Sequence, residues 1–356
     1  MKATSERQAT AWARRIAPAP EEVRPGLWAI ALPAGGNPIA YTIDYVFITD
    51  DGIALVDTGW ATEASATALA KELAAIGYSI TDISAILITH MHPDHFGLVP
   101  RILRANPDCR LFMHDADLRL VDGRSDALRQ RTTPRWQELM VSVGAPGSYE
   151  ITTRAMVTNR VDDDIASQVV TLAPDQVITL GSWSIRALWT PGHTPGHLCF
   201  LVEDHALLIS GDHILPTITP QVTQLSDPAD DILGNYLSSL RALRSLDVVE
   251  VLPAHQYRFT GLVERIDELL AHHERRFALL ENAAARSPGL TCYDLAHALD
   301  WRDPLVRMPT DQARMAVKET LAHLVHMQGA GRISARIGPP TTWWAADVMT
   351  TRRGIR

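Results

Sequence analysis

One short segment, residues 89–97, constrains the fold of this chain more than any other, and it reads THMHPDHFG. It places three histidines and an aspartate within six residues, after an apolar run typical of a buried strand. His90 and His92 share one side of an extended segment, and Asp94 and His95 can face a second point as the chain turns. Such a group is costly to bury without partners, so the segment predicts a metal site rather than a chance cluster.

Three later segments each bring a further strong ligand to the end of an expected strand. They read PGHTPGH at 191–197, GDH at 211–213 and PAH at 253–255. An α/β site is commonly built from loops at one edge of a sheet. We therefore expect these loops to complete the site.

The sequence around these motifs alternates between strand and helix patterns. Ala-rich spacing predicts a helix over 62–76, and Asp227 with Pro228 marks the start of another that runs to about 245. The expected strands are 27–32, 41–48, 53–56, 85–88, 110–113, 169–172, 177–180, 184–189, 198–203, 206–209 and 248–252.

Taken together, the motifs HxHxDH, PGHTPGH and GD and a histidine after a late strand resemble the metallo-β-lactamase superfamily over about residues 25–260. The resemblance implies the α/β fold of that superfamily, a four-layer αββα sandwich. It implies that Asp57 supports the ligand loop from behind. The ligands that it implies are His90, His92 and His193 for a first metal, Asp94, His95 and His255 for a second, and Asp212 as a bridge.

The implied cofactor is a pair of zinc ions per chain, although iron or manganese could occupy such nitrogen and oxygen ligands. The implied chemistry is hydrolysis by a metal-bridging hydroxide, which Asp94 orients while also binding metal. No G-x-S-x-G motif offers a serine nucleophile. We expect an ester, thioester or lactone of a small to mid-sized acyl compound as the substrate.

Within that resemblance, aspartate at position 212 favours the glyoxalase II-like and lactonase-like branches of the superfamily. The antibiotic-cleaving members carry cysteine or serine near the corresponding position. Glyoxalase II itself fits less well, because His193 follows His95 by 98 residues, which is longer than the usual spacing in that enzyme. Tyr257 either contacts substrate or is an ordinary loop aromatic. Trp60 could shape the acyl pocket, and His213 either contacts substrate or packs.

The predicted domains are an N-terminal arm over 1–25, a catalytic domain over 26–260 and a winged-helix-like domain over 261–356. Residues 123–170 lose the strand and helix rhythm and are interpreted as a lid insert. An extra surface subdomain and a homodimer contact are the alternatives for this insert. Its side chains that could shape the acyl pocket are Arg131, Arg135, Trp136 and Tyr149.

The winged helix raises a rival hypothesis, a metal-dependent endoribonuclease that holds RNA through this domain. Residues 261–356 carry 13 basic and 11 acidic side chains, and the whole chain has a net charge of −8. Such a small excess of basic side chains argues against nucleic acid as a partner.

We also expect a cytoplasmic protein without a membrane partner. No apolar run approaches the ~20 residues of a membrane span, and residues 1–25 lack the apolar core of a secretory signal. The three cysteines are too few and too widely spaced for a disulfide framework.

Overall fold

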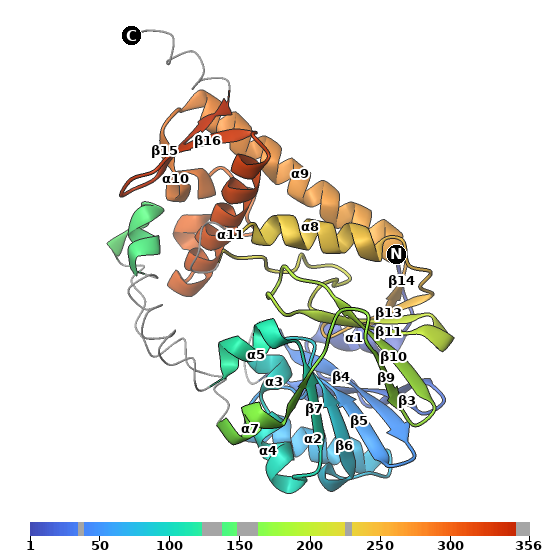
Figure 1. Cartoon of the computed structure of the whole chain (residues 1–356). Helices are drawn as coiled ribbons and strands as arrows, with labels where there is room; N and C mark the ends of the chain where they lie inside the picture. Colours follow the sequence, from blue (N-terminus) through green and yellow to red (C-terminus); the bar gives the residue numbers. More distant parts are fainter. Residues whose placement is uncertain (35–38, 123–136, 148–162, 225–229, 347–356) are drawn as a thin grey trace, which may run out of the picture. The chain divides into compact units, whose positions relative to one another are not determined.

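The chain folds into two compact units (Figure 1). The structure is a computed structural model that describes residues 1–34, 39–122, 137–147, 163–224 and 230–346. The first unit comprises Met1–Ser125, Thr158–Pro220 and Ser239–Ile266, and the second comprises Asp126–Val157, Gln221–Ser238 and Asp267–Arg356. Both units are therefore discontinuous in sequence, unlike the predicted split near residue 260.

One seven-stranded sheet of the first unit is built mainly from the N-terminal third of the chain. Adjacent strands from β2 to β5 are antiparallel, whereas those from β5 to β8 are parallel. In spatial order its strands are β2 (Glu21–Arg24), β3 (Leu27–Pro33), β4 (Tyr41–Thr49), β5 (Gly52–Val56), β6 (Ile83–Leu87), β7 (Arg110–Met113) and β8 (Val169–Thr171).

The other seven-stranded sheet collects the later strands. Adjacent strands of this sheet are antiparallel, except β12 and β13, which are parallel to each other. In spatial order its strands are β1 (Lys2–Ala3), β14 (Phe259–Thr260), β13 (Glu250–Pro253), β12 (Leu207–Gly211), β11 (Leu198–Val202), β10 (Trp183–Trp189) and β9 (Val177–Leu180).

An apolar core joins the two sheets, and it takes side chains such as Phe47 from one sheet and Phe200 from the other. A second core fills the other face of the first sheet, where Leu69 and Ile102 pack from helices. The parallel strands β5, β6 and β7 are thus largely buried on both faces, as their continuous apolar runs require, whereas β8 at the edge is exposed. The short helices of this unit are α2 (Glu63–Ala75), η1 (Ile80–Asp82), α3 (Pro93–Phe96), α4 (Val99–Ala105), α5 (Asp115–Val121), α7 (Asp163–Gln168) and η5 (Glu203–His205).

The N-terminal segment is not the loose arm that its polar composition predicts. Strand β1 pairs with β14, strand β2 pairs with β3, and helix α1 (Glu6–Arg14) lies between them in sequence. The Ser5 side chain caps this helix by accepting the Gln8 N–H at 3.0 Å. Arg258 donates to Glu21 at 2.7 Å, so charged residues that look solvated in sequence hold the segment down.

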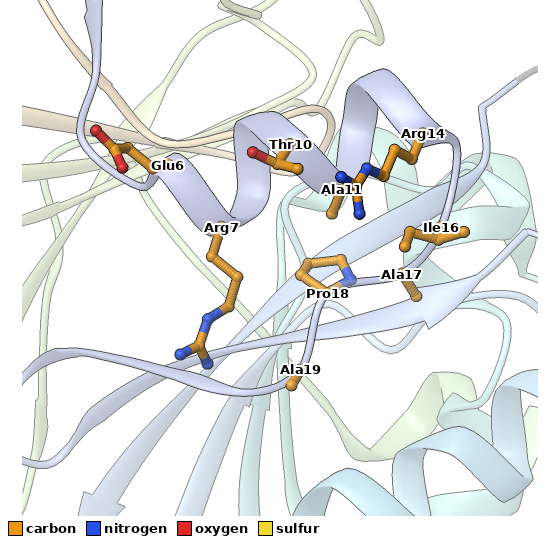
Figure 2. A pocket seen from close by; sticks show the side chains of 9 residues that line it. All are labelled: Glu6, Arg7, Thr10, Ala11, Arg14, Ile16, Ala17, Pro18 and Ala19. Carbon is orange, nitrogen blue, oxygen red and sulfur yellow. The ribbon is translucent and has the colours of Figure 1, made fainter.

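Helix α1 and the segment that follows it also line a shallow hollow (Figure 2). Arg7 and Arg14 both project from α1 at its edge, and the Arg7 guanidinium donates to the Pro20 carbonyl at 3.3 Å. None of the predicted site residues lines this hollow.

In the second unit, two α-helices after residue 290 are followed by a β-hairpin. Strands β15 (Leu290–Thr291), β17 (Thr342–Ala345) and β16 (Ile333–Arg336) form a small sheet in that spatial order. Assignment to the winged-helix class stays a prediction. The described helices that lie wholly in this unit are 137–142, α10 (Cys292–Ala296), η6 (Leu305–Arg307) and α11 (Thr310–Gly329). Two more helices, α8 (Ile232–Leu243) and α9 (Leu262–Arg286), each begin in the sequence range of one unit and end in that of the other.

The four side chains predicted to shape the acyl pocket from a lid, Arg131, Arg135, Trp136 and Tyr149, lie outside the described residues, as do Asp227 and Pro228. Among the described helices, none is long and apolar enough to cross a membrane.

A buried histidine pair links α9 to α11 within the second unit. The His273 Nδ1 lies 3.1 Å from the His323 Nε2, and the His323 Nδ1 donates to the Glu319 carbonyl at 2.8 Å. Burial, together with the nearby charge of Arg276, lowers the pKa of His323 to about 3, although the hydrogen bond to the Glu319 carbonyl opposes the shift. The pair is therefore held neutral, and each ring depends on the proton arrangement of the other.

We predict that this pair makes the second unit sensitive to acid. Between the unfolded pKa of about 6.5 and the folded value, only the unfolded chain takes up the proton, so stability is lost as pH falls. The loss is about 1.4 kcal/mol per pH unit for such a group. Urea titrations from pH 7.5 to 4.5 should show it, with exposure of α9 and α11 read by pulsed deuterium labelling at one fixed pH.

His323→Gln should flatten this pH dependence even if it lowers stability at every pH. His297→Gln is the matched control, because His297 is an exposed histidine of the same unit. Equal slopes for the unmodified chain and for His323→Gln would contradict the assignment.

Candidate metal centre

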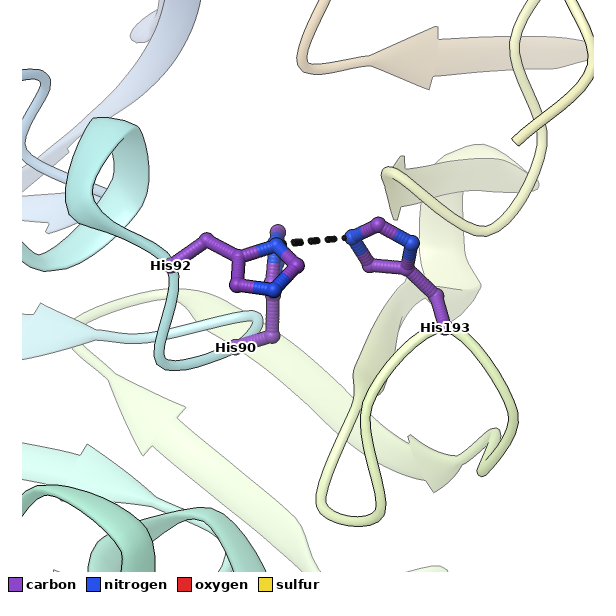
Figure 3. Close-up of side chains that lie close together, drawn as sticks. All are labelled: His90, His92 and His193. Carbon is purple, nitrogen blue, oxygen red and sulfur yellow. Dashed lines mark hydrogen bonds between the residues drawn. The ribbon is translucent and has the colours of Figure 1, made fainter. Parts of the chain in front are cut away.

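Three imidazole rings converge at the ends of strands from the two sheets (Figure 3). The His92 Nδ1 lies 3.0 Å from the His90 Nε2 and 2.9 Å from the His193 Nε2. The remaining pair, the His90 Nε2 and the His193 Nε2, is 3.2 Å apart. Three nitrogens from two loops therefore surround one point.

These nitrogens cannot satisfy one another. Burial and the neighbouring histidines lower the pKa of His92 to about 3, and they lower that of His90 well below its usual range. Each of the three nitrogens presents either an N–H or a lone pair, so at least one of the three contacts sets two lone pairs or two N–H groups against each other. Nitrogens bound to one tetrahedral zinc at about 2.0–2.1 Å lie about 3.3 Å apart, so the group fits such an ion.

A second group of ligands adjoins the first. Its members Asp94, His95 and His255 each offer one ligand atom within 4.8 Å of the others, and His95 and Asp212 form a similar group with His90. The His255 Nε2 lies 3.4 Å from Asp94 Oδ2 and 3.1 Å from Asp212 Oδ1. Asp212 therefore stands between the two groups, where the resemblance implies a bridging carboxylate.

Several atoms of this second group are buried without a hydrogen bond. The His95 Nε2, the His255 Nε2 and Asp212 Oδ1 have no hydrogen-bond partner among the residues that the structure describes. Burial alone would lower the pKa of His255, but the carboxylates of Asp212 and Asp94 raise it to about 10. Buried polar atoms are normally satisfied, so these atoms also fit a bound cation.

Asp57 orients the second group from behind. Its carboxylate lies 2.8 Å from the His95 Nδ1 and accepts the Thr89 N–H at 2.8 Å and the Thr89 hydroxyl at 2.7 Å. The His95 Nδ1 proton is therefore engaged, and the Nε2 is left free to bind metal. Asp57 itself adopts a left-handed backbone, with a φ of 63°, which is a costly conformation for a non-glycine residue.

Glycines allow the ligand loops to pass close to other parts of the chain. A Cβ at Gly97 would lie 2.3 Å from the Ala61 nitrogen, and one at Gly211 would lie 2.8 Å from the His197 ring. His197 is fully buried, and its Nε2 accepts the Asp212 N–H at 3.3 Å. His197 is therefore a core histidine, and it positions the loop of Asp212.

Asp117 is a residue of this centre that the sequence motifs did not reveal. It is fully buried on α5, and its carboxylate accepts hydrogen bonds from the Met91 N–H, the Thr194 hydroxyl and the Gly196 N–H. Burial raises the pKa of Asp117 to about 6, and these three hydrogen bonds limit the rise. In sequence it is one of two acidic residues in the first turn of a helix, which is a common pattern with no metal signature.

The predicted substrate residues are placed differently from one another. Tyr257 and Trp60 are both partly exposed. His213 is fully buried with its ring 5.4 Å from that of His197, which favours packing over substrate contact. His114, which is not one of the predicted substrate residues, caps α5 by accepting the Ala116 N–H at 3.2 Å, and its ring stacks on Trp189.

The family follows from this geometry together with comparison to known proteins. The model of the metallo-beta-lactamase superfamily matches residues 41–255, which is more than half of the chain and includes all seven ligand candidates. The chain belongs to that superfamily, whose fold is the α/β sandwich described above.

Curated relatives are similar over part of their length. The lactamase-like protein adaB of Aspergillus niger is 28% identical over 260 residues, which are 71% of this chain and 64% of that protein. An atrochrysone carboxyl ACP thioesterase of Aspergillus fumigatus is 26% identical over 66% of this chain and 42% of its own length. The chain thus covers less than two thirds of both relatives.

Solved structures share the fold over most of the chain. A metallo-beta-lactamase family protein of Thermus thermophilus superposes with a TM-score of 0.76 at 27% identity, covering 91% of this chain and all of that one. A beta-lactamase domain protein of Burkholderia ambifaria gives the same TM-score at 24% identity, over 92% of this chain and 93% of that one.

We predict that divalent metal stabilises the first unit through these ligands. Zinc at about 100 times its Kd should raise the free energy of unfolding by about 2.7 kcal/mol. His193→Ala removes one of the three converging nitrogens, so it should lower the zinc-dependent rise in Tm measured by calorimetry.

His205→Ala is the control for this experiment, because His205 lies on η5 outside the ligand groups. A zinc-dependent rise that is the same in His193→Ala and in the unmodified chain would refute the assignment of His193.

Proposed function

We propose that this protein is a dinuclear, zinc-dependent hydrolase that cleaves the ester, thioester or lactone bond of a small to mid-sized acyl substrate. The observation that carries the proposal is the pair of adjoining ligand groups, one of three imidazoles and one rich in carboxylates, with Asp212 between them. Nitrogen and oxygen ligands of this kind suit zinc, and iron or manganese would fit the same atoms.

The burial of the ligands supports an approach for substrate from one side. His90, His95 and His255 are at most 1% exposed, whereas Asp94 and Asp212 are each 8% exposed. His92 and His193 are also partly exposed. The acyl group would therefore meet the carboxylates and these two histidines first.

The residues have distinct roles in this proposal. Bound metal ions supply Lewis acidity and lower the pKa of water toward neutrality. Asp94 is held at its position by His255 and, at 3.6 Å, by His95, and it orients the attacking water toward the acyl carbon. Burial would raise the pKa of Asp94, but interaction with His95 and His255 lowers it to about 2, so its carboxylate is ionised and can only accept.

Two relatives support a hydrolytic reaction, and one of them is a thioesterase. One is the acyl carrier protein thioesterase of Aspergillus fumigatus, and another is described as the probable metallo-hydrolase YqjP of Bacillus subtilis, which is 24% identical over 66% of this chain. Acyl thioesters are therefore the first substrates to examine, ahead of lactones and aryl esters.

We predict that Asp94→Asn lowers kcat/KM for the best acyl substrate by at least about 10²-fold, because general base and orienting groups contribute about 10²–10⁴-fold. A panel of acyl thioesters, lactones and aryl esters with the zinc-loaded protein identifies that substrate. Asp108→Asn, a change at an exposed aspartate, is the matched control and should leave the rate unchanged.

The same panel should include single-stranded RNA. Turnover of RNA by the unmodified chain but not by His90→Ala, with no acyl hydrolysis, would replace the proposal by the endoribonuclease hypothesis. Full activity of Asp94→Asn on the acyl substrate would refute the role of Asp94.

A further inference from the structure

Asp117 connects two loops that supply different ligands of the three-histidine group. The loop after β6 carries His90 and His92, and the loop between β10 and β11 carries His193. These loops belong to different sheets, so their relative position is set by the contacts between them.

The contacts of Asp117 are divided between the two loops. Its Oδ2 accepts the Met91 N–H at 3.0 Å, between the two histidines of the first loop, and the Thr194 hydroxyl at 2.7 Å. Its Oδ1 accepts the Gly196 N–H at 2.6 Å in the second loop. Met91 and Thr194 each adjoin a ligand histidine in sequence, so a small shift of either moves a ligand nitrogen.

Close approach at Gly196 shows that this contact is built into the fold. A Cβ at Gly196 would lie 2.5 Å from the Asp117 nitrogen and 2.8 Å from its Cβ and Cγ atoms. No side chain larger than hydrogen fits there without moving the loop. Asp117 itself is placed by α5, where its N–H points to the His114 carbonyl at 3.2 Å.

We propose that Asp117 is a positioning residue that holds the loops of His90, His92 and His193 in register and thereby sets the metal affinity of that three-histidine site. This inference rests on the proposed metal function of the same centre. It assigns Asp117 to one of the two sites only, because the second group is oriented by Asp57 and by the Tyr41 carbonyl, which lies 3.3 Å from the His255 Nδ1.

The carboxylate is required because three donors converge on it from two directions. An asparagine of the same shape keeps one acceptor oxygen and has an NH₂ group in place of the other carboxylate oxygen. That exchange sets donor against donor at either the Met91 or the Gly196 nitrogen. A backbone bond from the Leu198 N–H to the Thr89 carbonyl, 2.8 Å long, would still join the loops at their base. The loops should thus remain folded but lose their register.

The test measures zinc affinity at each site separately, by competition with a chromophoric chelator. In a His255→Ala background, which weakens the second group, Asp117→Asn should weaken zinc binding by about 10–100-fold, the usual cost of losing a hydrogen-bond partner behind a ligand. In a His193→Ala background, the same change should alter zinc affinity by less than about threefold.

Asp115→Asn is the matched control, since Asp115 lies in the same helical turn and pairs with Arg119 on the surface. It should leave both affinities unchanged. Equal losses at both sites would show that Asp117 merely stabilises the fold, and an unchanged affinity of the three-histidine site would overturn the proposal. Absence of zinc binding in the His255→Ala background would also overturn it.

A second variant keeps the proposal testable if Asp117→Asn does not fold. Thr194→Val removes one donor to Asp117 and should weaken the three-histidine site, whereas Thr194→Ser keeps the hydroxyl and should restore it. Where Asp117→Asn does fold, adding Thr194→Val should cost much less than it does alone, since both act on one contact. Equal affinities for Val and Ser would contradict the proposal.

These readouts separate the inference from the proposed function. Zinc affinities are measured without substrate, so a chain that binds zinc but hydrolyses no acyl compound would refute only the function. A chain that hydrolyses acyl compounds but binds zinc equally with and without Asp117 would refute only the inference.

Discussion

The close approach of three imidazole nitrogens, all within 3.2 Å of one another, is the constraint on which the rest of the first unit depends. Three neutral rings at these distances cannot pair every contact as donor with acceptor, so the arrangement is unfavourable unless surrounding contacts hold it or a cation fills it. The nitrogens come from two sheets, and the apolar core between those sheets brings their edges together. The packing that joins the two sheets therefore also brings the ligands of the metal centre together.

Two buried carboxylates hold this arrangement from different sides. Asp57 engages His95 and Thr89, and Asp117 engages the backbone on either side of the three-histidine group. Each carboxylate accepts three hydrogen bonds, which offset the cost of removing its charge from water. Local backbone strain at Asp57 and the close approach at Gly196 are tolerated because these contacts over-determine both loops.

Much of this centre could be predicted from the sequence, because the ligands lie in short motifs at strand ends. The structure brings all seven candidates together, and the strands around them match the predicted ones to within a few residues. Asp117 could not be predicted, because its partners, two backbone N–H groups and one hydroxyl, lie 26, 79 and 77 positions away and leave no motif. The N-terminal segment was also predicted wrongly, since its pairing with β14 depends on contacts with residues near 260.

Anomalous diffraction from crystals of the zinc-loaded chain is the sharpest test of a dinuclear centre at these ligands, because it locates metal without reference to activity. We expect two peaks at the zinc edge, one between His90, His92 and His193 and the other between Asp94, His95 and His255, with Asp212 adjoining both. A structure with no peak among these residues, or with zinc bound only elsewhere on the chain, would contradict this expectation.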